Sequence, residues 1–289
     1  MKYKNVIVFG GSGFLGSHIC DHLTDKGYKV TIFDRKRSKY KKKNQKMCIG
    51  DITNFKTVNL AIKNKNYVYH FAGVSDIQES NSYPLKAIKF NIMGTTNILE
   101  ALKKQKKIKR LIFASSIYAR SKQGGFYSST KRSCESLIEE YSNIYKIQYN
   151  ILRFGSLYGS RANSFNTIYN IIDQSIKEKK IERDGDGMEI RNYINVTDAA
   201  KICIELLKKK YSNQYFDIVG KEKVSVKSVI NLISKKLSIK KIIYNKNKIQ
   251  NYHYKINPYT YKVRKAKILK MKKSIKLEDG INDIIKNLI

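Results

Sequence analysis

The first half of the chain alternates short apolar runs with longer stretches in which apolar residues recur every three or four positions. The short runs predict β-strands, and the longer stretches predict amphipathic helices. Strands are expected at residues 6–9, 29–33, 67–71, 110–114 and 149–154. Helices are expected between them at residues 15–26, 53–63, 84–104 and 129–145. This alternation predicts an α/β fold with a doubly wound parallel sheet and right-handed crossovers.

The second half of the chain has a looser pattern. Helices are expected there at residues 165–179, 197–209, 226–237 and 277–287. The 289 residues include 2 prolines and no Gly/Ser-rich tract, so no flexible linker is expected between lobes. We predict one domain from residues 1–155 with about 193–212, and a smaller C-terminal α/β lobe from residues 156–192 and 213–289.

Composition narrows the class of protein. The chain is 42% hydrophobic, which is enough for a sizeable core. Its apolar runs are far shorter than the ~20 residues of a membrane-spanning helix, and the run after Met1 is too short for a signal peptide. The four cysteines are scattered without a CxxC pair, which indicates reduced thiols and neither a disulfide framework nor a metal site. We therefore expect a cytoplasmic protein.

The net charge of +35 suggests nucleic acid or an anionic membrane as a partner. However, 48 lysines stand against 10 arginines, whereas phosphate recognition usually favours the arginine fork. The bias is more typical of compositional drift towards A/T-rich codons. We expect no specific nucleic-acid partner, and weak association with anionic surfaces stays open.

A cluster of glycines joins the first expected strand to the first expected helix. It fits GxGxxG through Gly11, Gly13 and Gly16, and GxxGxxG through Gly10, Gly13 and Gly16. There the free N–H groups and the helix dipole can hold a pyrophosphate against backbone that carries no Cβ. The loop predicts that the first domain is a Rossmann-type dinucleotide-binding domain.

Asp34 stands 18 residues after Gly16, at the end of the second expected strand. A carboxylate at that place can accept hydrogen bonds from both hydroxyls of an adenosine ribose, and it would repel a 2′-phosphate. NAD is therefore the expected cofactor. Arg35, Lys36 and Arg37 could neutralise a phosphate, so NADP remains an alternative.

Tyr127 and Lys131 are four residues apart, so on a helix they share one face. A tyrosine becomes a useful base when its pKa falls from about 10 towards 7. A nearby ammonium supplies about one to three units of that fall, and the positive nicotinamide ring of oxidised NAD could supply the rest. Ser116 ends an expected strand beside the same cleft and can hydrogen-bond the reacting oxygen.

With these motifs in place, the chain resembles the extended short-chain dehydrogenases/reductases of the NAD-dependent nucleotide-sugar epimerase/dehydratase family, including UDP-glucose 4-epimerase-like enzymes. The ordered motifs that carry the resemblance are "VFGGSGFLGSHICDHL", "GDI", "VYHFAG", "NIMGTTNILEA", "FASS", "YSSTK", "LRFGSLYGSR" and "RNYINVTDAA". The resemblance implies a nucleotide-diphosphate sugar as substrate and a homodimer built on a four-helix bundle.

The resemblance also implies roles for individual residues. Ser116, Tyr127 and Lys131 would be catalytic. The cofactor would contact Gly10, Gly13, Phe14, Leu15, Gly16, Asp34, Asp51, Ile52, Phe71, Ala72, Gly73, Tyr127, Lys131 and Phe154. The substrate would contact Ser75, Ser116, Ser156 and Arg191. Asn91, Gly94 and Asn97 are expected to serve helix packing and loop tethering.

Three features depart from the family pattern. Only ten residues separate Ser116 from Tyr127, where relatives usually carry a longer loop beside the sugar. Ile117 and Tyr118 occupy the places of the acidic pair of the family's dehydratases, which disfavours dehydration. A second phosphate-binding arginine is not evident near the C-terminus, where Lys248, His253 or Lys255 could substitute.

The function predicted from the sequence is nucleotide-sugar epimerisation, most simply at C4, through a transient 4-keto sugar. A 4-dehydrogenase or 4-ketoreductase of the same family is the main alternative. A dehydratase is less favoured, as is a non-enzymatic scaffold that binds NAD or RNA.

Overall fold

The computed structural model describes residues 4–245. Seven parallel strands form the main sheet in the order β10-β6-β5-β4-β1-β2-β3. Their bounds are β1 (Asn5–Phe9), β2 (Lys29–Asp34), β3 (Lys46–Ile49), β4 (Tyr67–His70), β5 (Arg110–Ser116), β6 (Tyr149–Phe154) and β10 (Gln214–Ile218). The chain order turns back at β1 and β4, so the carboxyl ends of these two strands mark the place where a ligand binds in a doubly wound sheet.

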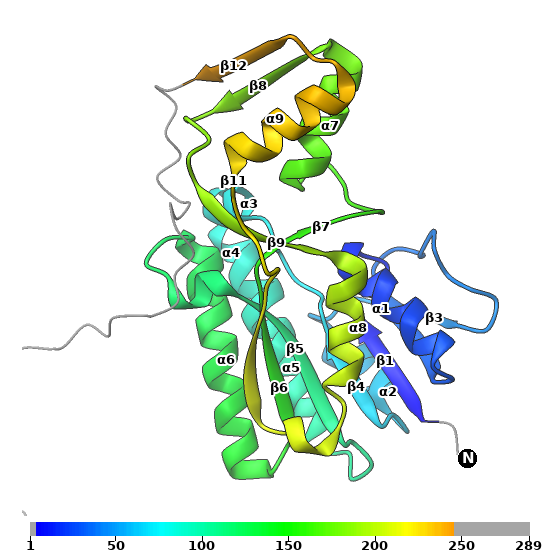
Figure 1. Ribbon diagram of the computed structural model, residues 1–289. Coiled ribbons are helices and arrows are strands. Elements are labelled where there is room, and N and C mark those ends of the chain that lie inside the picture. Colours follow the sequence, from blue (N-terminus) through cyan, green and yellow to red (C-terminus); the bar gives the residue numbers. More distant parts are fainter. Residues whose placement is uncertain (1–3, 246–289) are drawn as a thin grey trace, which may run out of the picture.

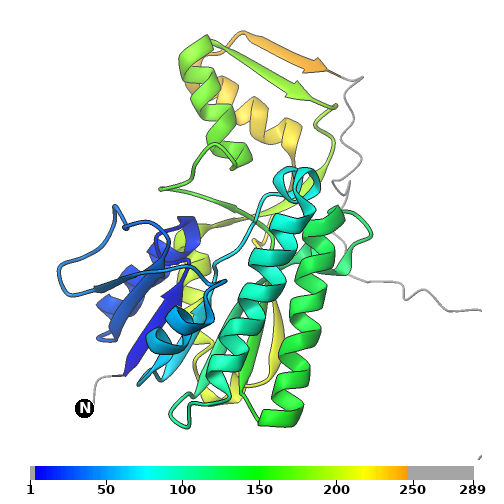
Figure 2. The same cartoon turned by 180° about the vertical axis from the view of Figure 1, so that it is seen from behind.

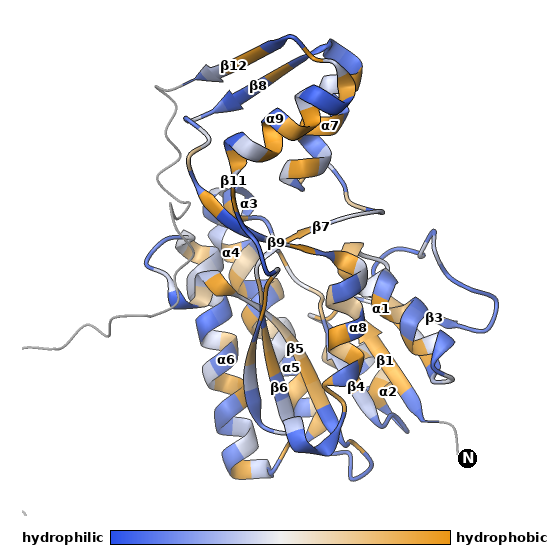
Figure 3. Cartoon of the chain, in the orientation of Figure 1, coloured by the Kyte–Doolittle hydropathy of each residue, from blue (hydrophilic) through white to orange (hydrophobic). Residues whose placement is uncertain are grey.

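Helices cover both faces of this sheet (Figures 1 and 2). On one face α1 (Phe14–Asp25) and α8 (Val196–Glu205) pack together, and on the other lie α2 (Phe55–Ile62), α5 (Gly94–Leu102) and α6 (Gly125–Tyr145). Each face has its own apolar core, as expected when both faces of a parallel sheet are buried. Figure 3 shows the same arrangement, with hydrophobic central strands and hydrophilic outer helix surfaces.

The smaller lobe stands at the carboxyl end of the main sheet (Figure 1). Its strands form a three-stranded sheet, β11-β9-β7, and a two-stranded sheet, β12-β8. Their bounds are β7 (Ser156–Tyr158), β8 (Lys180–Asp184), β9 (Ile190–Asn195), β11 (Lys223–Ser225) and β12 (Lys241–Asn245). Helices α7 (Thr167–Glu178) and α9 (Val226–Leu237) pack against each other and against β8 and β11, around a third apolar core.

Three chain passages join the two lobes, at β6 to β7, β9 to α8, and β10 to β11. Glycines allow two of these passages to press against β9. A Cβ added at Gly220 would lie 1.8 Å from the carbonyl oxygen of Tyr193, and one added at Gly155 would lie 3.0 Å from that of Asn192. The lobes therefore meet through closely packed backbone.

The strands and helices predicted for the first half are confirmed with shifts of a few residues at their ends. The helix predicted at 84–104 is a composite of α4 (Pro84–Ala87), a π-helical turn η1 (Ile88–Met93) and α5. Three further short elements complete the order: α3 (Ile77–Ser82) follows β4, the 3-10 turn η2 (Ile117–Arg120) follows β5, and the 3-10 turn η3 (Lys209–Tyr211) precedes β10.

Strand β3 was not predicted, and β10 requires a correction. The sequence placed residues 213 onward in the smaller lobe, whereas β10 hydrogen-bonds to β6 and forms the edge of the main sheet. The sequence QYFDI of this strand shows no regular alternation of polar and apolar residues, so its place in the sheet is decided by backbone pairing with β6. The helix predicted at 277–287 lies outside the described residues.

Candidate active site

The glycine loop forms a tight turn between β1 and α1. Gly10 has φ +79°, and the N–H of Gly13 donates to the carbonyl oxygen of Gly10 at 3.1 Å. A Cβ added at Gly16 would lie 2.1 Å from that same oxygen. The N-cap of α1 is Gly13, with no side chain capping the helix. This bare cradle, with free N–H groups at a helix N-terminus, fits a dinucleotide pyrophosphate.

Asp34 lies directly beside the glycine loop. Its Oδ2 accepts a hydrogen bond from the backbone N–H of Ser12 at 3.0 Å, which fixes the carboxylate at the end of β2. Arg35 does not face this carboxylate, because its guanidinium stacks on the ring of Phe90, 4.6 Å from the centroid. This geometry fits the predicted role of Asp34, in which its carboxylate would accept hydrogen bonds from the hydroxyls of the adenosine ribose.

The segment after β4 closes one side of the cradle. A Cβ added at Gly10 would lie 2.6 Å from the backbone nitrogen of Ala72 and 2.8 Å from the carbonyl oxygen of Phe71. The ring of Phe71 in turn meets the ring of Phe154 edge to face, with centroids 6.2 Å apart. The structure therefore brings the predicted loop, the segment 71–73 and the end of β6 together.

Asp51 and Ile52 follow β3 at the same edge of the sheet, each with a local partner. The Asp51 carboxylate accepts hydrogen bonds from the backbone N–H and the hydroxyl of Thr53, both at 2.8 Å. The carbonyl oxygen of Ile52 accepts from the side-chain amide of Asn97 at 2.9 Å, and the Ile52 side chain fills the space beside Gly94. These contacts confirm the predicted tethering role of Asn97 and the packing role of Gly94.

Asn91 ties the loop after β4 to α6. Its side-chain oxygen accepts from the N–H of Val74 at 2.8 Å, and its amide donates to the carbonyl oxygen of Val74 at 3.1 Å and to the hydroxyl of Thr130 at 3.0 Å. Asn91 lies in the π-helical turn η1, which interrupts the regular helix at this place. The predicted tethering role of Asn91 is confirmed.

The three residues predicted to be catalytic lie together at the carboxyl end of β5. Ser116 ends this strand, and its side chain hydrogen-bonds that of Tyr127 in the first turn of α6. Lys131 lies one turn further, and its Nζ donates to the carbonyl oxygen of Ala114 at 2.8 Å and lies 5.8 Å from the centroid of the Tyr127 ring. All three side chains are buried.

The pKa of the phenol differs from the prediction. Burial raises the pKa of Tyr127 to about 12, the hydrogen bond from Ser116 opposes this rise, and the Asp76 carboxylate adds to it. Burial also lowers the pKa of Lys131, while Cys134 and Glu135 act in the opposite direction. The Lys131 ammonium bonds to backbone, so the residues of this chain alone do not make Tyr127 acidic.

The other residues predicted to contact the substrate also lie beyond the carboxyl ends of the main-sheet strands. Ser75 is exposed in the loop after β4, Ser156 opens β7, and Arg191 is buried in β9, the strand that pairs with β7. The Arg191 guanidinium donates to the carbonyl oxygen of Ile190 at 3.0 Å. The ion pair Glu135–Arg153 in this region was not predicted from the sequence. The signal that could have indicated it is the position of Glu135, four residues after Lys131 on the same helix.

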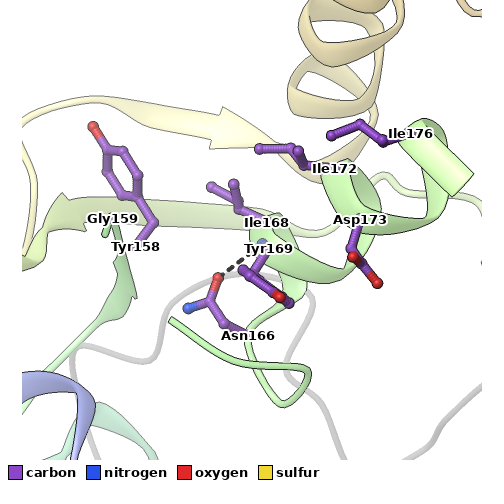
Figure 4. Close-up of a pocket in the computed structure, with 8 residues that line it drawn as sticks. All are labelled: Tyr158, Gly159, Asn166, Ile168, Tyr169, Ile172, Asp173 and Ile176. Atoms are coloured by element: carbon purple, nitrogen blue, oxygen red, sulfur yellow. Dashed lines mark hydrogen bonds between the residues drawn. The ribbon is translucent and has the colours of Figure 1, made fainter. Parts of the chain in front are cut away.

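A cavity of about 390 Å³ lies in the smaller lobe, next to β7 (Figure 4). It is lined by Tyr158, Gly159, Asn166, Ile168, Tyr169, Ile172, Asp173 and Ile176. Asn166 caps α7 there by accepting from the N–H of Tyr169 at 3.2 Å. None of these residues belongs to the predicted site, although Tyr158 lies in the same strand as Ser156.

The fold and the glycine loop define a class, the dinucleotide-binding α/β proteins with a doubly wound sheet. Residues 6–219 match the NAD dependent epimerase/dehydratase family, and the chain belongs to this family. It is an NAD-dependent enzyme. Across residues 4–245, none of the helices combines the length and the apolarity needed to cross a bilayer.

Two proteins with similar sequences match nearly the whole chain. The chain is 28% identical to a putative UDP-glucose 4-epimerase from Methanocaldococcus jannaschii, with 97% of each chain covered. It is 26% identical to a UDP-glucuronate 4-epimerase from Thermodesulfobacterium geofontis, with 95% of this chain and 93% of the relative covered. A solved structure of a UDP-N-acetylglucosamine 4-epimerase from Methanobrevibacter ruminantium M1, in complex with UDP-N-acetylmuramic acid, is similar with a TM-score of 0.80, 26% identity and 90% of each chain covered.

Proposed function

We propose that this protein is an NAD-dependent nucleotide-sugar 4-epimerase. The observation that carries the proposal is the convergence of Ser116, Tyr127 and Lys131 beside the glycine cradle. The names of the similar proteins support the proposal, because several of them are 4-epimerases of UDP-sugars.

In this proposal Tyr127 takes the proton of the sugar 4-hydroxyl, and Ser116 hydrogen-bonds the same oxygen. Bound NAD supplies hydride transfer and, in its oxidised form, a positive charge near the phenol. That charge matters here because the protein alone raises the pKa of Tyr127. Tyr127 returns the proton when the 4-keto sugar is reduced again on its other face, and Lys131 keeps a cation one turn away throughout.

The substrate-side residues have separate tasks in this proposal. Arg191 pairs with the diphosphate through its fork of donors, while Ser75 and Ser156 contact the sugar. Asp34 selects NAD through the ribose hydroxyls, and the remaining predicted cofactor residues line its path from Gly10 to Phe154. Dehydration is disfavoured, because Ile117 is a buried apolar residue and Tyr118 packs edge to face on Tyr127. Neither residue offers the carboxylate of an acid–base pair.

We also propose that the protein is a homodimer. Large apolar side chains on α4, η1 and α6 remain exposed, including Leu85 at 83%, Met93 at 54% and Phe126 at 46%. A second copy that packs these helices into a four-helix bundle would cover them.

The test is turnover of UDP-glucose, UDP-galactose, UDP-N-acetylglucosamine and UDP-glucuronic acid, followed by chromatography of the sugar nucleotides and absorbance at 340 nm. An epimerase interconverts a C4 pair without net change at 340 nm. Tyr127→Phe is expected to lower kcat at least 100-fold, whereas Tyr118→Phe, a matched loss of a neighbouring hydroxyl, retains turnover. Stoichiometric reduction of NAD would show a dehydrogenase instead.

A further inference from the structure

One charged cluster lies directly behind the trio. The carboxylate of Glu135 on α6 accepts two hydrogen bonds from Arg153 on β6, from Nε at 2.9 Å and from the terminal NH2 nitrogen at 2.6 Å. It also accepts one from the hydroxyl of Ser115 on β5 at 2.5 Å. Ser115 and Arg153 are direct neighbours in the sheet register. One carboxylate thus fastens α6 to two adjacent strands.

The cluster is largely shielded from water. The side chains of Glu135 and Arg153 are 7% and 13% exposed, and the Arg153 guanidinium stacks 4.5 Å from the ring centroid of Tyr215. A buried ion pair needs such complete hydrogen bonding to offset desolvation. Arg153 neutralises the carboxylate of Glu135, and the charge of this carboxylate also acts on a second cation nearby, Lys131.

Glu135 and Lys131 lie on neighbouring turns of α6. Glu135 lies four residues after Lys131, so the two share one face of α6. They bond to consecutive residues of β5, since Lys131 donates to the carbonyl oxygen of Ala114 while Glu135 accepts from the hydroxyl of Ser115. Together they fix the helix against the strand that ends at Ser116.

The other groups around Lys131 carry no negative charge near neutral pH. On β4, the burial of His70 lowers its pKa to about 3, so it is neutral. On α6, burial raises the pKa values of Tyr127 and Cys134, which keeps both protonated. On β5 the ammonium meets the ring of Phe113 at 5.0 Å. Within the described part of the chain, Glu135 is the one carboxylate among the groups that shift the pKa of Lys131.

We propose that Glu135 is a positioning residue of the active site, the counter-charge of the Lys131 ammonium, and that Arg153 and Ser115 hold its carboxylate in place. The inference rests on the proposed function only in assigning Lys131 to catalysis. The inference itself is that the negative charge of Glu135, and not only its hydrogen bonds to β5 and β6, keeps the buried Lys131 protonated. This statement can be tested on the protein without any substrate.

The test compares loss of charge with loss of anchoring. Glu135→Gln keeps the shape and removes the charge, Glu135→Asp keeps the charge, and Arg153→Met removes the anchor while the carboxylate remains. The titration of Lys131 is followed by NMR of protein labelled at the lysine ε-carbons, without added cofactor, and its signal is assigned by its loss in Lys131→Met. In Glu135→Gln the titration midpoint of Lys131 is expected to fall by about one unit or more. In the other two variants it does not fall.

Activity provides a second, separate readout. In Glu135→Gln the alkaline limb of kcat moves to lower pH by the same amount, with KM retained, and Glu135→Asp restores it. An unchanged Lys131 midpoint in Glu135→Gln, or an equal fall in Glu135→Gln and Arg153→Met, would overturn the inference. Absence of sugar turnover in the unaltered protein, alongside the expected NMR shifts, would instead overturn the proposed function and leave the inference standing.

Discussion

The close approach of Gly16 to Gly10 allows a quantitative prediction. In Gly16→Ala the new Cβ would lie 2.1 Å from the carbonyl oxygen of Gly10, a backbone atom that cannot rotate away. An ordinary contact at this place would be 3.4 Å or more, so the loop and the start of α1 must separate by over 1 Å. Overpacking of this kind costs about 1–3 kcal/mol of stability, or a fall in Tm of roughly 2–10 °C.

The effect on cofactor binding should exceed the effect on stability. The same displacement moves the N–H groups that we propose face the pyrophosphate, and each lost bond to a charged group is worth about 1.5–3 kcal/mol. We expect the Kd for NAD to rise roughly 10- to 150-fold for one lost bond. Calorimetric titration measures the Kd, and thermal unfolding followed by circular dichroism measures the Tm.

Gly27→Ala is the matched control. Gly27 has φ +79° with nothing within 4 Å of an added Cβ, so alanine there carries backbone strain but no clash. That strain costs about 1–2 kcal/mol at a turn outside the proposed cofactor site, and NAD affinity should be retained. Wild-type affinity for NAD in Gly16→Ala, with Gly27→Ala unchanged, would refute the assignment of the glycine loop as the pyrophosphate cradle.

Four further outcomes are expected. Asp34→Asn raises the Kd for NAD at least 10-fold and reduces the ratio of the Kd for NADP to the Kd for NAD, as measured by titration with both cofactors. Arg191→Met raises KM for the sugar nucleotide more than it lowers kcat, and an effect on kcat alone would contradict a diphosphate contact. His70, whose pKa falls from 6.5 to about 3 on burial, binds a proton more readily in the unfolded chain. Stability is therefore lost as pH falls from 6.5 towards 3, by about 3 kcal/mol at pH 4.5. Urea unfolding at pH 7 and 4.5 should show a smaller difference in His70→Gln. Leu85→Asp, at an exposed apolar position, should shift the protein from dimer to monomer in sedimentation velocity.

Local signals explain why much of the fold was predictable. The glycine loop, Asp34 and the pair Tyr127–Lys131 are read from short spacings that fix a turn, a strand end and one helix face. The elements that the sequence did not reveal depend on distant partners. Strand β3 is four residues long and ends a highly basic loop, and β10 is placed only by its pairing with β6.

The electrostatics of the site also could not be predicted fully from the sequence. The spacing of Tyr127 and Lys131 predicted a shared helix face, and the structure confirms it. The spacing gave no measure of desolvation, which outweighs the hydrogen bond from Ser116 and raises the pKa of the phenol. The partnership of Glu135 with Arg153 joins residues 18 positions apart and became visible only when β6 was placed beside β5.

The three backbone passages between the lobes bear on how a sugar could be turned over. A lobe attached at one point can swing freely, whereas rotation of this lobe would have to bend all three passages and disturb the close packing of Gly155 and Gly220 against β9. The structure therefore favours a small change in the gap between Tyr127 on one side and Arg191 on the other. If both faces of a 4-keto sugar are to meet the same hydride donor, the sugar ring itself must flip within a stationary frame, while its diphosphate stays tethered.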